Sequence, residues 1–299
     1  MILKMTGAWC KRSDSWQVGG RTPRRARTSE LVRYMETYTT KLNNNDITEF
    51  DEQGYLFIPA LLTPEETEVL QRDIPDMLNR QGPEVVREPG PNSAIRLVYG
   101  GHVHYESFRR LSLHPRLLNP VRQLVRDEVY IHQSRMNPKP GFGAGGAWTW
   151  HQDYGTWHRV DGMQQPEAVM TAVFLNDCTA VNAPLMVVPG SQHHGLIDDV
   201  AKDEQAEGYA LFDIDRQTLQ ALADAHGIEA LMGPAGSVCF LHCNLVHGSS
   251  NNVSPWDRTI MYMNYNAVSN ACTGTDRVWY HNNRDFTPLV ALEDGCLIG

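Results

Sequence analysis

The chain has 299 residues, and its 35 acidic side chains outnumber its 26 Lys and Arg to give a formal net charge of −9. This balance disfavours nucleic acid and anionic membranes as partners, because proteins bind both through basic residues. No apolar run approaches the roughly 18 residues of a transmembrane helix, so we expect no membrane partner. The length is sufficient for one large β domain or two small domains.

The six cysteines are scattered at 10, 178, 239, 243, 272 and 296, and none forms a CxxC pair. Cys239 and Cys243 lie in a hydrophobic run, which indicates buried free thiols. This usage fits a reducing compartment, and we expect a cytoplasmic protein.

Residues 1–34 differ from the rest of the chain, being rich in Arg, Ser, Gly and Trp without helical or strand periodicity. They fit a basic arm, a transit peptide or an extension created by an upstream start codon, with Met35 as the true start. In each case we expect loose packing or disorder. A single domain is expected over 35–299.

The first expected elements are a short helix, a turn at Gly54 and a strand within residues 47–59. A second helix should begin after Thr63, because this N-cap is followed by Pro64 and by Glu66 at the third helical position. Its apolar stripe is expected to contain Leu70, Ile74 and Leu78.

Two further helices are expected, at 111–125 and 216–226. Short apolar runs punctuated by Pro and Gly predict strands at 129–136, 168–175, 184–188, 237–242 and 259–265. Many short strands with helices before and between them indicate a mainly β protein with flanking helices, a jelly roll.

The strongest chemical signal is His151 and Asp153, followed much later by His247. His-x-Asp and a distant His is the ligand pattern of the two-His-one-carboxylate triad, which holds Fe(II) on one face and leaves the other open. In an extended segment, residues i and i+2 point the same way, so one stretch can supply two ligands. In a chain with 12 histidines, however, His-x-Asp alone arises easily by chance.

Arg258 follows His247 across a polar turn and begins an alternating run that predicts a strand. A guanidinium there can bind a carboxylate through two hydrogen bonds, including the distal carboxylate of a 2-oxo acid on the metal. The alternative is an ordinary surface arginine.

Several motifs in the same order resemble the phytanoyl-CoA dioxygenase superfamily, most closely its ectoine hydroxylase branch. They are Tyr-Ile-His-Gln-Ser-Arg-Met-Asn at 130–137, Trp-His-Gln-Asp-Tyr-Gly-Thr-Trp-His at 150–158, Ala-Pro-Leu-Met-Val-Val-Pro-Gly-Ser at 183–191, Asn-Leu-Val-His-Gly-Ser at 244–249 and Tyr-Asn-Ala-Val-Ser-Asn at 265–270. The resemblance implies a double-stranded β-helix (jelly roll, cupin-like), Fe(II) and O2, with 2-oxoglutarate as cosubstrate.

The resemblance also implies roles for single residues. Asn137 would contact 2-oxoglutarate, Ser249 would donate to its carboxylate, and Gln133 would lie on the substrate side. Trp157 aligns with an aromatic residue that stacks on substrate. From the residues alone, Asn137 and Ser249 are equally turn residues, and Trp157 is equally a core residue.

The match to the branch is partial around the substrate. Gly155 replaces a family glutamate, and two aromatic positions that close on ectoine appear here as Leu241 and Tyr262. We therefore expect a dioxygenase that hydroxylates a small polar metabolite, such as an amino acid or an intermediate of specialised metabolism. Coenzyme A esters are disfavoured because no basic patch for nucleotide phosphates is visible.

Two alternatives stay open: ectoine 5-hydroxylase itself, and a non-catalytic, cupin-like binding protein. A homodimer is compatible with the sequence. The pair His193 and His194 follows a tight Pro-Gly-Ser turn and is expected to be solvated rather than to bind metal.

Overall fold

The computed structural model describes residues 40–88, 94–143, 145–198, 200–203 and 211–299. Its helices are α2 (Asn44–Gln53), α3 (Pro64–Asn79), α4 (Gly101–His104), α5 (Glu106–Ser112), α6 (Pro115–Val125), α7 (Asp153–Asp161), α8 (Arg216–His226) and the 3₁₀ turns η1 (Ser191–His194) and η2 (Val268–Asn270). Its strands are β1 (Tyr55–Ile58), β2 (Val85–Arg87), β3 (Ile95–Tyr99), β4 (Val129–Lys139), β5 (Trp148–His151), β6 (Ala168–Phe174), β7 (Leu185–Val187), β8 (Val200–Asp203), β9 (Leu211–Ile214), β10 (Glu229–Leu231), β11 (Val238–His242), β12 (His247–Ser249) and β13 (Arg258–Ala267).

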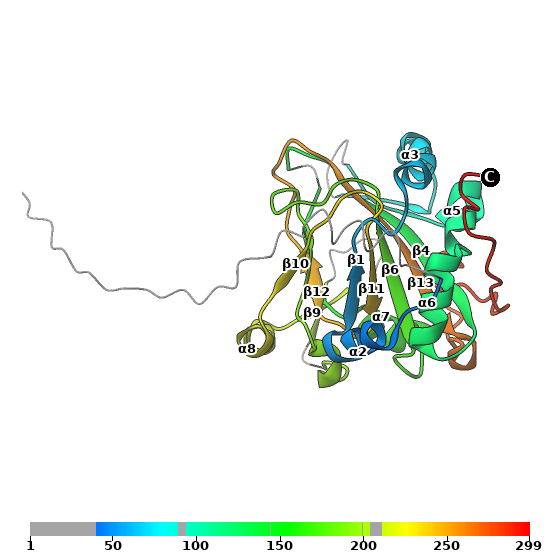
Figure 1. Ribbon diagram of the computed structural model, residues 1–299. Helices are drawn as coiled ribbons and strands as arrows, with labels where there is room; N and C mark the ends of the chain where they lie inside the picture. Colours follow the sequence, from blue (N-terminus) through cyan, green and yellow to red (C-terminus); the bar gives the residue numbers. More distant parts are fainter. Residues whose placement is uncertain (1–39, 89–93, 144, 199, 204–210) are drawn as a thin grey trace, which may run out of the picture.

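Two antiparallel sheets form the body of the molecule. The larger has seven strands in the order β1-β11-β6-β13-β4-β3-β2, and the smaller has four in the order β10-β7-β12-β5. The crossing order and the antiparallel pairing are those of a jelly roll, which confirms the expected fold class. Figure 1 shows α5 and α6 on the outer side of the larger sheet, with the C-terminal segment running past them.

The larger sheet separates two cores. On its outer face, Met263 belongs to one core together with helix residues such as Phe108 and Leu118. On its inner face, Met170 and Leu241 join the second core, which includes residues of the smaller sheet. Strand side chains alternate between the two faces, so β1, β6, β11 and β13 each contribute to both cores.

The N-terminal elements confirm the sequence prediction. Gly54 ends α2 with φ of 79°, and Thr63 caps α3 through a capping box with Glu66. One position of the predicted stripe was wrong, since Leu78 is 37% exposed and Met77 is buried instead. At 100° per residue, position 77 lies about 20° from Leu70 and position 78 about 80° from it.

The helical region expected at 111–125 is confirmed, but the chain divides it between two helices, α5 and α6. The first ends at Ser112, and His114 caps the second by accepting a hydrogen bond from the Arg116 N–H. Pro115 starts the new helix and disfavours helical geometry at the residue before it. The helix predicted at 216–226 is confirmed as α8.

The five predicted strands are all present, but β4 continues through Asn137 to Lys139. The chain also contains strands and helices that the sequence did not predict, among them α4 and α7. Because α7 begins at Asp153, only Gln152 between the two expected ligands is extended, with φ of −115° and ψ of 124°.

Other expectations have mixed outcomes. The predicted extension at 1–34 lies outside the described residues, and homodimer formation stays a prediction. Cys239 and Cys243 are buried free thiols, as expected. No helix in the described part of the chain is long and apolar enough to cross a membrane.

Gly54 allows a direct test of the junction between α2 and β1. A Cβ there would meet the Gln192 side chain and would lie 2.8 Å from Leu245 Cδ1, whereas Gly143 has a similar φ of 79° and nothing within 4 Å. Both alanine variants carry left-handed strain of roughly 1–2 kcal/mol. We expect Gly54→Ala to lower the thermal midpoint by at least twice as much as Gly143→Ala. Equal midpoints in a calorimetric scan would contradict this account.

Candidate functional site

Strand pairing brings the two histidines together. In the smaller sheet, β12 lies beside β5 and places His247 directly opposite His151, with their ring centroids 4.3 Å apart. The turn at Gln152 then carries Asp153 to the same point. The Gln152 amide holds this turn by donating to Gly195 O and Asn244 O at 2.9 and 2.8 Å.

The three side chains converge on one point. Asp153 Oδ1 lies 3.8 Å from His151 Nε2, and Asp153 Oδ2 lies 3.8 Å from His247 Nε2. All three ligand atoms lie within 4.8 Å of one another, and all three residues are buried. The structure therefore assembles the three ligands predicted from sequence.

The protonation of the rings follows from their backbone contacts. His151 Nδ1 is 2.6 Å from Thr149 O, and His247 Nδ1 is 3.0 Å from Leu245 O. A carbonyl can only accept, so each Nδ1 carries the proton and each Nε2 presents its lone pair to Asp153. Such outer contacts are what orient metal-binding histidines.

Burial keeps the rings neutral. Desolvation, assisted by neighbouring His247, lowers the pKa of His151 to about 3, and desolvation also lowers the pKa of His247. Two neutral nitrogens and one carboxylate oxygen thus face each other. This donor set fits a divalent cation with N and O ligands such as Fe(II).

A buried arginine, Arg135, stands beside the carboxylate. Its Nη2 donates to Asp153 Oδ2 at 2.5 Å and its Nη1 donates to Gln133 Oε1 at 2.8 Å. The guanidinium carbon Cζ of Arg135 lies over the Tyr262 ring, 5.4 Å from the ring centroid. The sequence reading missed Arg135, although it alternates with Gln133 and Asn137 along one strand and therefore shares their face.

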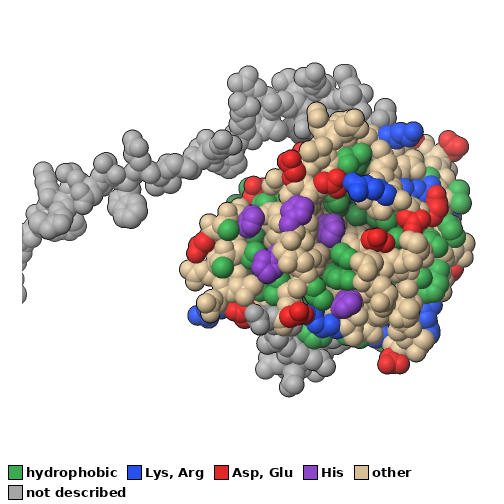
Figure 2. All heavy atoms as spheres, turned by 90° about the horizontal axis from the view of Figure 1, so that it is seen from below, with side chains coloured by type: hydrophobic (Ala, Val, Ile, Leu, Met, Phe, Trp, Pro, Cys, Tyr) green, Lys and Arg blue, Asp and Glu red, His purple; other side chains and the backbone are tan. Residues whose placement is uncertain are grey.

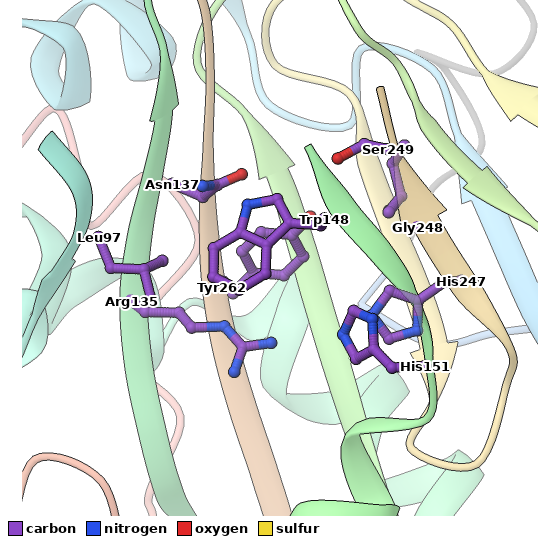
Figure 3. A pocket seen from close by; sticks show the side chains of 10 residues that line it. Leu97, Arg135, Asn137, Trp148, His151, His247, Gly248, Ser249 and Tyr262 are labelled. Carbon is purple, nitrogen blue, oxygen red and sulfur yellow. The ribbon is translucent and has the colours of Figure 1, made fainter. Parts of the chain in front are cut away.

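The pocket has a second polar end. In Figure 3, Asn137 and Ser249 lie at one end, the histidine pair and the Arg135 guanidinium lie at the other, and Trp148 and Tyr262 lie between them. The pocket is narrow, with a cavity volume of about 30 Å³. Trp148, also missed from sequence, comes from the strand that ends at His151.

Arg258 lies behind Asn137 at this second end. It is buried, with Nη1 donating to Asn137 Oδ1 at 3.0 Å and with Nε and Nη2 donating to Ala183 O at 3.0 and 2.9 Å. These bonds orient the guanidinium and leave two of its five N–H groups for another acceptor. The alternative of a surface arginine is therefore wrong.

Other predicted residues lie deeper. Gln133 is buried, and its amide donates to His281 O at 3.0 Å. Trp157 is fully buried, with its ring 5.0 Å from that of His132. Leu241 belongs to the inner core with Tyr262. Their contacts with a substrate stay a prediction.

Gly155 has a different environment from that expected. A Cβ at this position would meet Arg159 Nη1 at 2.9 Å and Leu196 Cδ1 at 3.8 Å. Neither residue lines the pocket. The missing family glutamate thus bears on the pocket less directly than Tyr262, which lines it.

One other cluster among the described residues resembles a metal site. Glu66, His114 and Asp294 converge, but the Arg116 guanidinium already contacts both carboxylates and supplies the cation. Figure 2 shows several histidines close together on one face of the molecule. His193 and His194 are exposed, as the sequence predicted.

Comparisons with known proteins agree with this geometry. The family model described as phytanoyl-CoA dioxygenase (PhyH) matches residues 50–260. The L-proline trans-4-hydroxylase of Streptomyces griseoviridis is 35% identical over 253 residues, covering 82% of this chain and 94% of the relative. The ectoine dioxygenase of Bordetella bronchiseptica is 36% identical over 256 residues, covering 82% of each protein.

A solved structure is similar over most of the chain. EctD from S. alaskensis, crystallised with 2-oxoglutarate and 5-hydroxyectoine, has 33% identity and a TM-score of 0.75, covering 87% of this chain and 91% of EctD. The same enzyme with bound Fe gives a TM-score of 0.74 over the same shares of the two chains.

Removal of any one converging ligand should abolish metal binding. We expect His151→Ala, Asp153→Ala and His247→Ala each to weaken Fe(II) binding by at least about 100-fold, because even loss of an outer-shell partner costs 10–100-fold. Anaerobic Fe(II) titration measures the affinity, and circular dichroism checks folding. Exposed His193→Ala is the matched control. A folded variant with near-normal affinity would remove its residue from the ligand set.

Proposed function

We propose that this chain, which belongs to the phytanoyl-CoA dioxygenase family, hydroxylates an unactivated C–H bond of an amino acid or another small polar metabolite. It is an Fe(II)- and 2-oxoglutarate-dependent dioxygenase. The observation that carries the proposal is the convergence of His151, Asp153 and His247 at one end of a pocket whose other end is lined by Asn137 and Ser249.

The protein's own part in the reaction is binding and orientation. His151, Asp153 and His247 would hold the metal, and Arg135 would fix the Asp153 carboxylate. When bound, Fe(II) and 2-oxoglutarate supply the oxidising chemistry, in which O2 is consumed, succinate and CO2 are released, and the substrate gains a hydroxyl group.

The far end of the pocket suits the distal carboxylate of 2-oxoglutarate. Arg258 brings a buried positive charge, Asn137 holds the guanidinium in place, and Ser249 offers a hydroxyl within the pocket wall. Charge-assisted hydrogen bonds of this kind are roughly twice as strong as neutral ones. We therefore assign Asn137, Ser249 and Arg258 to cosubstrate binding.

The substrate side is proposed from the residues near Arg135. Arg135 and Tyr262 line the pocket, and Gln133, Leu241 and Trp157 lie behind them. The cavity has a volume of only about 30 Å³, below the usual range for small-molecule sites. So narrow a pocket favours a small metabolite over a coenzyme A ester.

Ectoine 5-hydroxylase remains the alternative, favoured by the identity with ectoine dioxygenases. The sequence identity with L-proline trans-4-hydroxylase is 35%, against 36% with the ectoine dioxygenase. It therefore supports an amino acid substrate just as strongly. We also propose the cytoplasm as the location, which the free thiols support.

Arg258→Ala should raise the 2-oxoglutarate concentration needed for half-maximal succinate release. Truncating one partner of a buried charged pair costs roughly 2–5 kcal/mol, which corresponds to about 30-fold or more. Arg258→Lys keeps the charge but loses the paired donors, so its effect should be intermediate.

Arg122→Ala is the control, because Arg122 also donates to a backbone carbonyl, Leu289 O, and lies far from the pocket in sequence and fold. Its KM for 2-oxoglutarate should be that of the wild type. An unchanged KM in the Arg258→Ala protein would exclude Arg258 from cosubstrate binding.

Ectoine should be a poor substrate or none. Leu241 and Tyr262 change the shape and polarity of the pocket wall, and a hydrogen-bonding site discriminates strongly against ligands that leave its groups unpaired. A screen of ectoine, L-proline, other amino acids and small amines for succinate release, with mass analysis of products, measures this. Stoichiometric hydroxylation of ectoine at a typical enzymatic rate, on the order of 1–10 per second, would restore the ectoine assignment.

A further inference from the structure

Three unpartnered polar atoms belong to residues that surround the Gln133–Arg135 pair of β4, two of these residues on its neighbouring strands. Among the described residues, the Tyr99 hydroxyl, the His281 Nε2 and the Asn264 Oδ1 are buried without a hydrogen-bond partner. Each such atom costs about 1–3 kcal/mol when nothing pairs with it. Three such atoms around one hydrogen-bond network indicate that a ligand supplies the missing partners.

The polarity of Asn264 is fixed by its neighbours. Arg135 can only donate, so Gln133 Oε1 must accept, and Asn264 Nδ2 then donates to the same oxygen at 3.3 Å. The amide cannot be turned around without placing two oxygens against each other. Asn264 Oδ1 is therefore left as an acceptor that requires a donor from outside the described residues.

Tyr99 and His281 extend the same network. Tyr99 pairs with Arg135 in the β3–β4 register, so their side chains share one face of the sheet. The His281 ring meets the Tyr99 ring edge-on, with centroids 4.6 Å apart, and its backbone oxygen accepts from the Gln133 amide at 3.0 Å.

Both groups can accept a hydrogen bond at neutral pH. Burial, together with Arg277 and Arg135, lowers the pKa of His281 to about 3, so the ring is neutral and one nitrogen has a free lone pair. Burial raises the pKa of Tyr99, so its oxygen stays a hydroxyl, which accepts as well as donates.

We propose that Tyr99, His281 and Asn264 form a nitrogen subsite, which receives the N–H groups of a substrate whose carboxylate faces Arg135. The inference rests on the proposed function and names its substrate class: an amino acid with a primary or secondary amine close to its carboxylate. Two cations, Arg277 and Arg135, lie near His281, but Arg277 is paired with Asp161 and Arg135 would face the substrate carboxylate. The subsite thus sets the orientation of a zwitterion beside the metal.

The test uses variants that remove one polar atom each. Tyr99→Phe deletes only the hydroxyl, and His281→Phe keeps a ring against Tyr99 and keeps the backbone contact with Gln133. Tyr265→Phe is the matched control, because the Tyr265 hydroxyl is buried on the opposite face of the sheet and donates to Ser112 O at 2.9 Å.

Activity is compared on pairs of compounds that differ at the nitrogen. The first pair is L-proline and tetrahydrofuran-2-carboxylate, and each further amino acid that releases succinate is paired with its oxygen analogue. We expect the wild type to favour the amine at least about 100-fold. Tyr99→Phe and His281→Phe should each lower kcat/KM for the amine by about tenfold, mainly through KM, and Tyr265→Phe should not.

Thermal stability gives a second, substrate-free signature. Tyr99→Phe should melt at or above the wild-type temperature, because it removes an unpartnered hydroxyl, whereas Tyr265→Phe should melt about 2–4 °C lower. A structural role for the Tyr99 hydroxyl predicts a lower melting temperature and an unchanged KM.

Each outcome decides between the claims. The subsite is overturned by equal use of the amine and its oxygen analogue, by a preferred substrate without N–H, or by variants with wild-type KM values. Each of these results leaves the proposed function intact. Absence of Fe(II)-dependent succinate release in every wild-type reaction overturns the proposed function. The melting comparison then still tests the subsite, which fails if Tyr99→Phe is clearly destabilised.

Discussion

The fully buried carboxylate of Asp153 is the constraint on which the rest of the site depends. A buried charge is tolerated only with a partner, and Arg135 is the partner that the protein provides. The arginine contacts Oδ2, while Oδ1 faces His151. Asp153 and Arg135 balance each other's charge, and the two neutral histidines present the lone pairs to which a divalent cation would bind. Anchoring by Arg135 therefore orients the carboxylate before any metal arrives.

One strand connects both ends of the pocket. Along β4, Gln133, Arg135, Asn137 and Lys139 occupy alternate positions, and all are buried. The first pair orients groups at the metal end, and Asn137 holds Arg258 at the other. Lys139 Nζ donates to Gly146 O and to Ser250 O, which joins the loops that precede β5 and follow β12. The strand thus fixes the distance between the two ends as well as the loops that carry them.

The sequence predicted what local pattern and spacing encode. Capping residues located α3, and His151, Asp153, His247 and Arg258 were found from their spacing and residue type. What failed was decided by contacts between distant segments. The i, i+2 argument placed Asp153 in an extended segment, but it begins a helix, because Gln152 is held by carbonyls from two other loops.

The substrate side shows why sequence pattern alone stops there. Tyr99, His281 and Asn264 come from three separate segments and carry no motif, and only their shared network with Gln133 marks them. Trp157 illustrates the converse, since its motif is strong but its side chain is fully buried against His132. Motifs report the chemistry that a family shares, whereas selectivity resides in polar atoms whose need for a partner is visible only in the folded chain. The unpaired acceptors, more than the motif residues, should therefore determine which small metabolite this enzyme accepts.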